Sequence, residues 1–161
     1  MIDIKELSIG NWVQNRRNEP MKIVGLTEPV IDIVKADGTH KIVSGDDIFP
    51  IQIQHRILTR NGFVADNPED EWGIYRWSNT VGEDYVVKNY IDIHKFYVVE
   101  ERREYEPVMW NVCISSDVEC PNPEKNFTVY TMPNISYIHH LQNQLSMMCV
   151  DKEINITKEM I

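Results

Sequence analysis

The N-terminal third of the chain reads as a series of short strands joined by tight turns. Five segments are rich in strand-forming residues, namely 11–14, 21–26, 30–36, 39–44 and 51–54. Between the third and the fourth, Asp37-Gly38 supplies the residue types that tolerate positive φ, which predicts a two-residue type I′ hairpin turn. Five short strands bury a core most simply by curling into a small barrel. The pattern therefore predicts a small SH3-like barrel over residues 1–56.

Residues 57–161 are predicted to form an antiparallel sheet and one C-terminal helix. Strand-like segments recur at 72–77, 84–90, 94–99, 108–115 and 127–132, after a short helix at 56–61 that ends at Gly62. The apolar residues Ile138, Leu141, Leu145 and Met148 then recur at helical spacing. We expect the sheet to cover this apolar stripe; a homodimer through the helix is the alternative. The fold class is mainly β (α+β), in one compact unit or two.

The charge distribution favours some partners over others. The net charge is −9; residues 1–56 contribute −1 and residues 57–161 contribute −8. Nucleic-acid binding needs a basic face, so the acidic second part disfavours it. A local basic patch remains possible in the barrel, where Arg16 and Arg17 are the candidate residues. No apolar run of 18 residues and no secretory signal is present, so we expect a cytoplasmic protein without membrane contact.

The chain lacks the motifs of known catalytic and cofactor sites. It contains no nucleophile elbow, phosphate loop or dinucleotide fingerprint. His139 and His140 are adjacent, whereas zinc-binding helices place histidines at i and i+4 so that both face one ion. Cys113, Cys120 and Cys149 do not have the spacing of a zinc knuckle or ribbon and are expected to be free thiols. The sequence therefore predicts no catalytic residue, no metal and no cofactor.

Three short motifs carry a family resemblance. They are Leu-x-Ile-Gly-Asn-Trp-Val at 7–13, Ile-Leu-x-x-Asn-Gly-Phe at 57–63 and Ile-x-Tyr-Ile-His-x-Leu-Gln-Asn at 135–143. In this order the chain resembles a group of small proteins encoded by phages, prophages and mobile elements of gut Bacteroidales-type bacteria. The resemblance implies a phage or mobile-element setting and the cytoplasm of a bacterial host cell. It assigns no activity to any residue.

Together these features predict a non-enzymatic accessory protein that acts by binding a protein partner, with a host-directed inhibitor as one concrete form. The candidate partner-binding residues are acidic: Asp66, Glu69, Asp70, Glu71, Glu100, Glu101 and Glu104. Their common sign predicts a partner with a basic face and binding that weakens with salt. The alternatives are a nucleic-acid or nucleotide-binding module that uses Arg16 and Arg17 of the barrel, and a small hydrolase.

Overall fold

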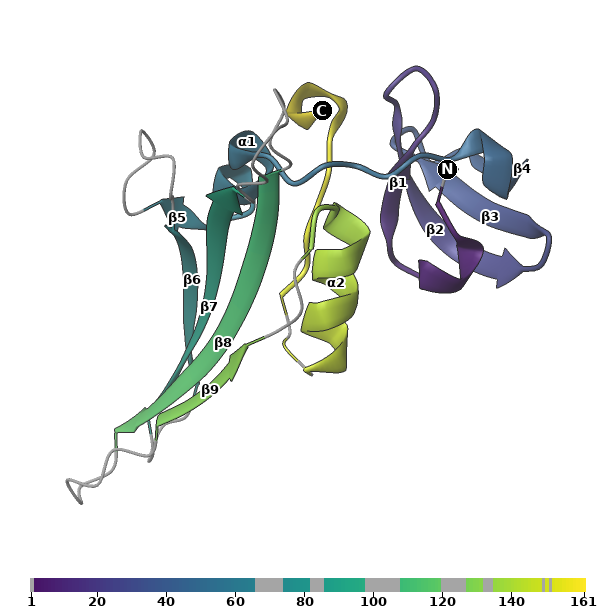
Figure 1. The fold of residues 1–161 in the computed structure, drawn as a ribbon. Coiled ribbons are helices and arrows are strands. Elements are labelled where there is room, and N and C mark those ends of the chain that lie inside the picture. Colours follow the sequence, from purple (N-terminus) through teal and green to yellow (C-terminus); the bar gives the residue numbers. More distant parts are fainter. Residues whose placement is uncertain are drawn as a thin grey trace. The chain divides into compact units, whose positions relative to one another are not determined.

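The chain is mainly β and divides into two compact units (Figure 1). The computed structural model describes residues 2–65, 74–81, 86–97, 108–119, 127–131, 135–148, 150 and 152–161. Unit 1 comprises Met1–Ile57 and Ser136–Ile161, and unit 2 comprises Leu58–Ile135. The first boundary lies beside the expected division at residues 56 and 57. The second boundary was not foreseen: the chain returns to unit 1 for its last segment.

Unit 1 is built on a four-stranded antiparallel sheet of consecutive strands. Its strands are β1 (Trp12–Gln14), β2 (Pro20–Thr27), β3 (Val30–Lys35) and β4 (His40–Ser44), with short 3-10 helices at η1 (Ile4–Glu6), η2 (Gly45–Asp47) and η3 (Lys158–Met160). Alternate strand residues, such as Ile31 and Ile33, point into one apolar core because side chains alternate along a strand.

The predicted closure into a barrel is not present as a continuous ladder in the described residues. The sheet has two edge strands, and the segment after η2 pairs with the β1 backbone through a single bridge between Gln14 and Phe49. The fifth expected strand, 51–54, is extended chain with a single bridge from Gln52 to Tyr137. Ile51 and Ile53 are nevertheless buried, so their alternation reflects packing beside this bridge and not membership of the sheet.

The β3–β4 hairpin differs from the predicted type I′ turn. Lys35 N–H donates to the Thr39 carbonyl at 3.0 Å, which leaves a three-residue loop, and within it only Gly38 has a positive φ, +81°. A type I′ turn needs positive φ at both central residues. The Asp37 carboxylate instead accepts a hydrogen bond from Thr39 N–H at 2.9 Å, and this bond lowers the pKa of Asp37. The local side-chain bond selects the longer loop.

The C-terminal helix α2 (Ile138–Met147) belongs to unit 1, whereas the sequence grouped it with the second sheet. That the second sheet covers its apolar stripe stays a prediction. Leu141 and Leu145 are buried, as the apolar spacing predicted. The polar side chains of the same helix bond the beginning of β1. Gln142 accepts from Trp12 N–H at 2.9 Å and donates to the Gly10 carbonyl at 3.1 Å. Its carboxamide thus pairs with β1 as a neighbouring strand would, and protects that edge.

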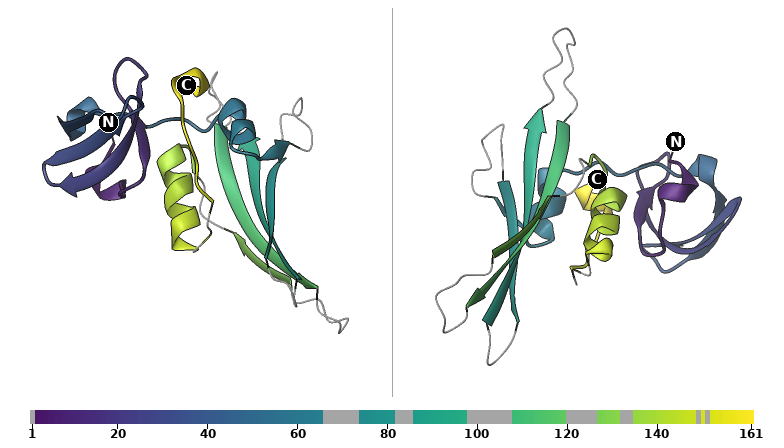
Figure 2. Two further views of the ribbon diagram at one scale, coloured as in Figure 1. Left: turned by 180° about the vertical axis from the view of Figure 1, so that it is seen from behind. Right: turned by 60° about the horizontal axis from the view of Figure 1, so that its bottom comes forward.

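Unit 2 is a five-stranded antiparallel sheet of consecutive strands preceded by a short helix. The helix is α1 (His55–Arg60), which crosses the boundary from unit 1, and the strands are β5 (Val64–Ala65), β6 (Ile74–Val81), β7 (Val86–Tyr97), β8 (Val108–Glu119) and β9 (Phe127–Thr131). Figure 2 shows the long curved pair β7 and β8.

The two predicted strands 84–90 and 94–99 form the single strand β7. Ile91 and Ile93, which lie between them, are both buried, so the alternation continues without a break. Ile93 pairs with the buried Val112 of β8, and Trp110 packs against Tyr75 with ring centroids 5.7 Å apart. In the described part of the chain, no helix is long and apolar enough to cross a membrane.

Candidate functional site

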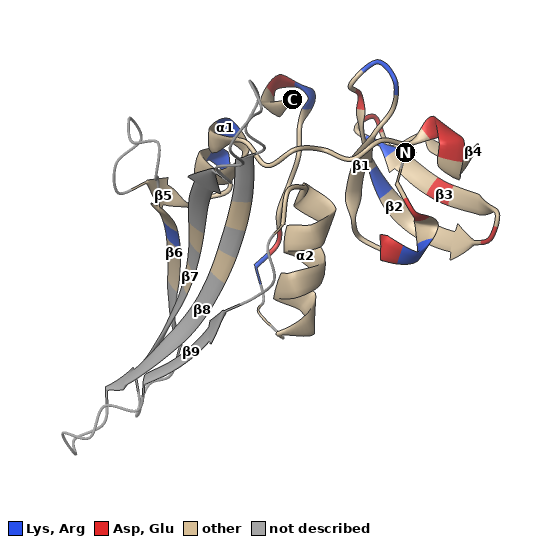
Figure 3. Ribbon diagram, viewed as in Figure 1, with Lys and Arg blue, Asp and Glu red and all other residues tan. Residues whose placement is uncertain are grey.

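The acidic residues expected to bind a partner lie outside the described residues. They are Asp66, Glu69, Asp70, Glu71, Glu100, Glu101 and Glu104. Cys120 and Cys149 also lie outside them. The residues expected to serve the alternative function, Arg16 and Arg17, are described. They belong to the loop between β1 and β2 in unit 1, the loop that carries blue in Figure 3.

The two arginines line an open hollow on unit 1 with a volume of about 370 Å3. Its charged lining consists of Arg16, Arg17, Lys35, Lys41, Glu19 and Asp47. Four cationic and two acidic side chains make a local net charge of +2, on a chain whose net charge is −9. Sequence spacing did not reveal this cluster, because the two lysines come from β3 and β4 and only the hairpin brings them to the arginine loop.

Side-chain hydrogen bonds from Asn15 hold the loop that carries the arginines. The Asn15 side-chain oxygen accepts from Arg17 N–H at 2.8 Å and from Glu19 N–H at 3.0 Å. The Asn15 amide donates to the Glu19 carboxylate at 2.7 Å, and Asn18 completes the turn with a φ of +56°. These local bonds order the backbone and leave both arginine side chains exposed.

Glu19 is one of the two acidic residues that line the hollow. The hydrogen bond from Asn15 is the main cause that lowers the pKa of Glu19, and the charges of Lys35, Lys158 and Arg17 act in the same direction. One carboxylate therefore lies among several cations and is already bonded to a neutral amide. The cations keep hydrogen-bonding capacity for an additional anion, because Arg and Lys donate to several acceptors at once.

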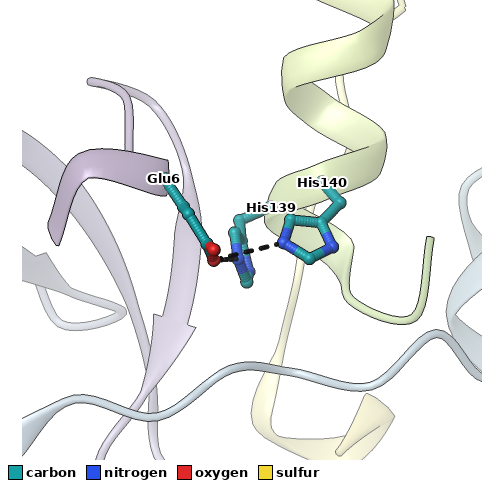
Figure 4. A group of neighbouring side chains, drawn as sticks. All are labelled: Glu6, His139 and His140. Atoms are coloured by element: carbon teal, nitrogen blue, oxygen red, sulfur yellow. Dashed lines mark hydrogen bonds and ion pairs between the residues drawn. The ribbon is translucent and has the colours of Figure 1, made fainter. Parts of the chain in front are cut away.

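A second cluster of side chains brings together residues from the two sequence segments of unit 1. Figure 4 shows Glu6 of η1 facing His139 and His140 at the first turn of α2. The Glu6 Oε2 atom lies 3.4 Å from His140 Nε2 and 3.9 Å from His139 Nε2. The two imidazole centroids are 4.2 Å apart. One ligand atom from each residue lies within 4.8 Å of the others, so the rings converge although their positions in the sequence are adjacent.

Asn143 places Glu6 beside the histidines. Its amide donates to the Glu6 backbone carbonyl at 2.7 Å, and its side-chain oxygen accepts from the Asn11 amide at 2.9 Å. Because residues four apart lie on the same face of a helix, this bond holds η1 against the face that carries His139. The backbone segments that carry the cluster, η1 and the beginning of α2, are therefore held next to each other.

His139 is the buried member of the cluster. Its side chain is 1% exposed, against 30% for His140 and 54% for Glu6. Neither ring nitrogen of His139 has a hydrogen-bond partner among the described residues, since 3.9 Å from Glu6 is too long. Tyr137 stacks on the ring at an interplanar angle of 7°. Burial, with a smaller effect from His140, lowers the pKa of His139 to about 4, so the imidazole is neutral at pH 7.

The sequence singled out the histidine pair but not its carboxylate. Glu6 lies in an ordinary charged N-terminal segment, more than a hundred residues before His139. The sequence analysis argued from the adjacent positions of the two histidines that they are poorly placed to share one ion, yet their ring centroids lie only 4.2 Å apart. At the first turn of α2 both rings turn toward the incoming η1 (Figure 4).

Known proteins do not add to this description: no protein-family model matches the chain, and neither the curated proteins nor the solved structures include a significant match.

Proposed function

We propose that the protein is a non-enzymatic binding protein and that unit 1 binds the phosphates of nucleic acid at the hollow lined by Arg16 and Arg17. The observation that carries the proposal is the local net charge of +2 in this hollow, on an acidic chain. A guanidinium group can donate two parallel hydrogen bonds to one phosphate, and two neighbouring arginines can contact successive phosphates. The ordered Asn15 loop reduces the conformational entropy lost on binding.

The topology of unit 1 supports the same role. A four-stranded antiparallel meander followed by a 3-10 helix and a bridge back to β1 is consistent with a small SH3-like barrel that opens at one seam. In that arrangement the arginine loop and the β3–β4 hairpin form one rim. We assign to this rim a single-stranded nucleic acid whose phosphates contact the cationic side chains. We expect no sequence preference, because the residues that line the hollow include no aromatic side chain on which a base could stack.

The test is binding of a fluorescently labelled single-stranded oligonucleotide, measured by anisotropy across a salt series. Four cationic contacts predict a slope of roughly −3 in log affinity against log salt. The double variant R16Q/R17Q should bind at least about tenfold more weakly and lower the slope by about 1 to 2. The matched control is K5Q/R60Q, which removes the same charge from exposed positions that do not line the hollow.

Two results would contradict this assignment. Equal loss of affinity in both double variants would mean that the oligonucleotide responds only to net charge. No measurable binding at low salt would exclude the nucleic-acid function, and would favour the second candidate.

The second candidate is the protein partner with a basic face. Its support is the net charge of −8 over residues 57–161. A phage or mobile-element setting fits a host-directed role. This binding should also weaken with salt, but it should survive R16Q/R17Q and be lost when the acidic residues Glu100, Glu101 and Glu104 are changed to Gln. The two variants therefore separate the two functions.

A further inference from the structure

We propose that Glu6, His139 and His140 form a site for a divalent first-row transition metal ion, with zinc as the reference ion. This site is independent of the cationic hollow and reverses the expectation that the chain binds no metal. The ligand set is two imidazole nitrogens and one carboxylate oxygen. Zinc and its neighbours accept such a set, whereas calcium and magnesium prefer oxygen ligands only.

All three ligand atoms lie within 4.8 Å of one another, and one of the separations already fits a shared ion. Two ligand atoms that each lie about 2.0–2.1 Å from a tetrahedral ion are roughly 3.3 Å apart. Glu6 Oε2 and His140 Nε2 are 3.4 Å apart, which matches this separation without movement. Glu6 Oε2 and His139 Nε2 are 3.9 Å apart, and a small shift of the Glu6 side chain, which is 54% exposed, would close that gap.

The buried member points independently to a ligand. A buried polar group without a hydrogen bond is costly, and His139 has two such nitrogens in a side chain that is 1% exposed. Coordination would satisfy one of them.

The exposed side of the cluster defines what the ion can do. Three protein ligands leave the fourth tetrahedral position to water or to an external ligand, on the side where Glu6 and His140 reach solvent. The ion would also link η1 to α2, which belong to the two separate sequence segments of unit 1. We therefore expect metal binding to stabilise unit 1 against unfolding, because the site exists only when both segments are in place.

The test uses the full chain after removal of metal with a chelator. Calorimetric titration with zinc chloride should show one equivalent bound per chain, and zinc in hundredfold excess over its Kd should raise the Tm by at least about 5 °C. Cobalt(II) should give the visible absorption of a four-coordinate site. The variants Glu6→Gln and His139→Leu should lose the zinc-dependent Tm rise. Both should remain folded without metal, since Glu6 is exposed and leucine fills the buried position.

The matched control is the exposed pair of His40 and Asp32, whose ring nitrogen and carboxylate oxygen are 3.7 Å apart. This pair resembles the site but lacks a buried histidine, so His40→Asn should leave the zinc response unchanged. Three results would overturn the proposal: no zinc bound by the wild-type chain, unchanged zinc affinity in Glu6→Gln and His139→Leu, or loss of the response in His40→Asn. A wild-type Tm that does not change although zinc binds would place the ion elsewhere.

Discussion

Acidification of the metal-free protein should destabilise unit 1 through His139. Burial holds the pKa of this ring at about 4 in the folded chain, against an ordinary 6.5. Between these two values the unfolded chain binds more protons than the folded chain, so the free energy of unfolding falls as the pH falls. The groups that face the ring are Tyr137, His140 and Glu6. Of these, His140 lowers the pKa and the Glu6 carboxylate raises it.

The size of the effect follows from the pKa difference. Each unit corresponds to about 1.4 kcal/mol, so the full contribution is about 3 kcal/mol. Most of it is present at pH 7, and about 2 kcal/mol is lost by pH 5, because the unfolded imidazole is then almost fully protonated. The remaining loss occurs as the pH approaches 4. A loss of this size is a substantial part of the stability of a small unit.

The measurement is urea unfolding at a series of pH values between 4 and 8 in the presence of a chelator. Other side chains titrate in this range, so the informative quantity is the difference between the wild type and His139→Leu. That difference should change by about 2 kcal/mol between pH 7 and pH 5, in favour of the variant at low pH. Parallel curves for the two proteins would refute the burial of a neutral imidazole. A difference of opposite sign would mean that the Glu6 carboxylate outweighs the effect of burial.

Two further predictions concern α2, and urea unfolding measures both. Leu141→Ala should cost about 2–5 kcal/mol because the side chain is fully buried, whereas Met147→Ala, at a position that is 77% exposed, should change stability by no more than about 0.5 kcal/mol; equal effects would show that the buried face is misassigned. Gln142→Ala should cost about 1–3 kcal/mol because it leaves Trp12 N–H and the Gly10 carbonyl without their partner, and Gln142→Glu should cost more, since a carboxylate cannot donate to that carbonyl. A stable Gln142→Glu variant would contradict the assigned amide orientation.

Local patterns in the sequence predicted the elements better than their partners. The strands of unit 1 fall within about two residues of their predicted positions, because alternation and turn residues act over short distances. The same is true of the buried face of α2 that includes Leu141 and Leu145. An apolar stripe on a helix indicates only that another part of the protein covers it, and does not identify that part. That β1 and the segment before it lie against α2 depends on the Gln142 and Asn143 amides, which no periodicity reveals.

The candidate sites illustrate the same difference at the level of side chains. Arg16 and Arg17 are adjacent in the sequence and were therefore noticed, whereas Lys35 and Lys41 join them only through the β3–β4 hairpin. Glu6 reaches His139 only through the return of the chain to unit 1. Sequence spacing reports proximity within one element, and it is silent about contacts that depend on the topology.

The division of unit 1 into two segments has a consequence for synthesis on the ribosome. The β1–β4 sheet emerges first, but α2, whose amides bond the edge of β1, emerges only after all of unit 2. Until then the backbone groups of Gly10 and Trp12 have no helix to bond, and the nascent sheet presents an open edge. Unit 2 can complete its own strand ladder in the meantime, because its strands pair in sequence order. The inserted unit therefore matures before its host, and a ribosome that stalls within residues 58–135 would hold an N-terminal sheet available for pairing with other nascent chains.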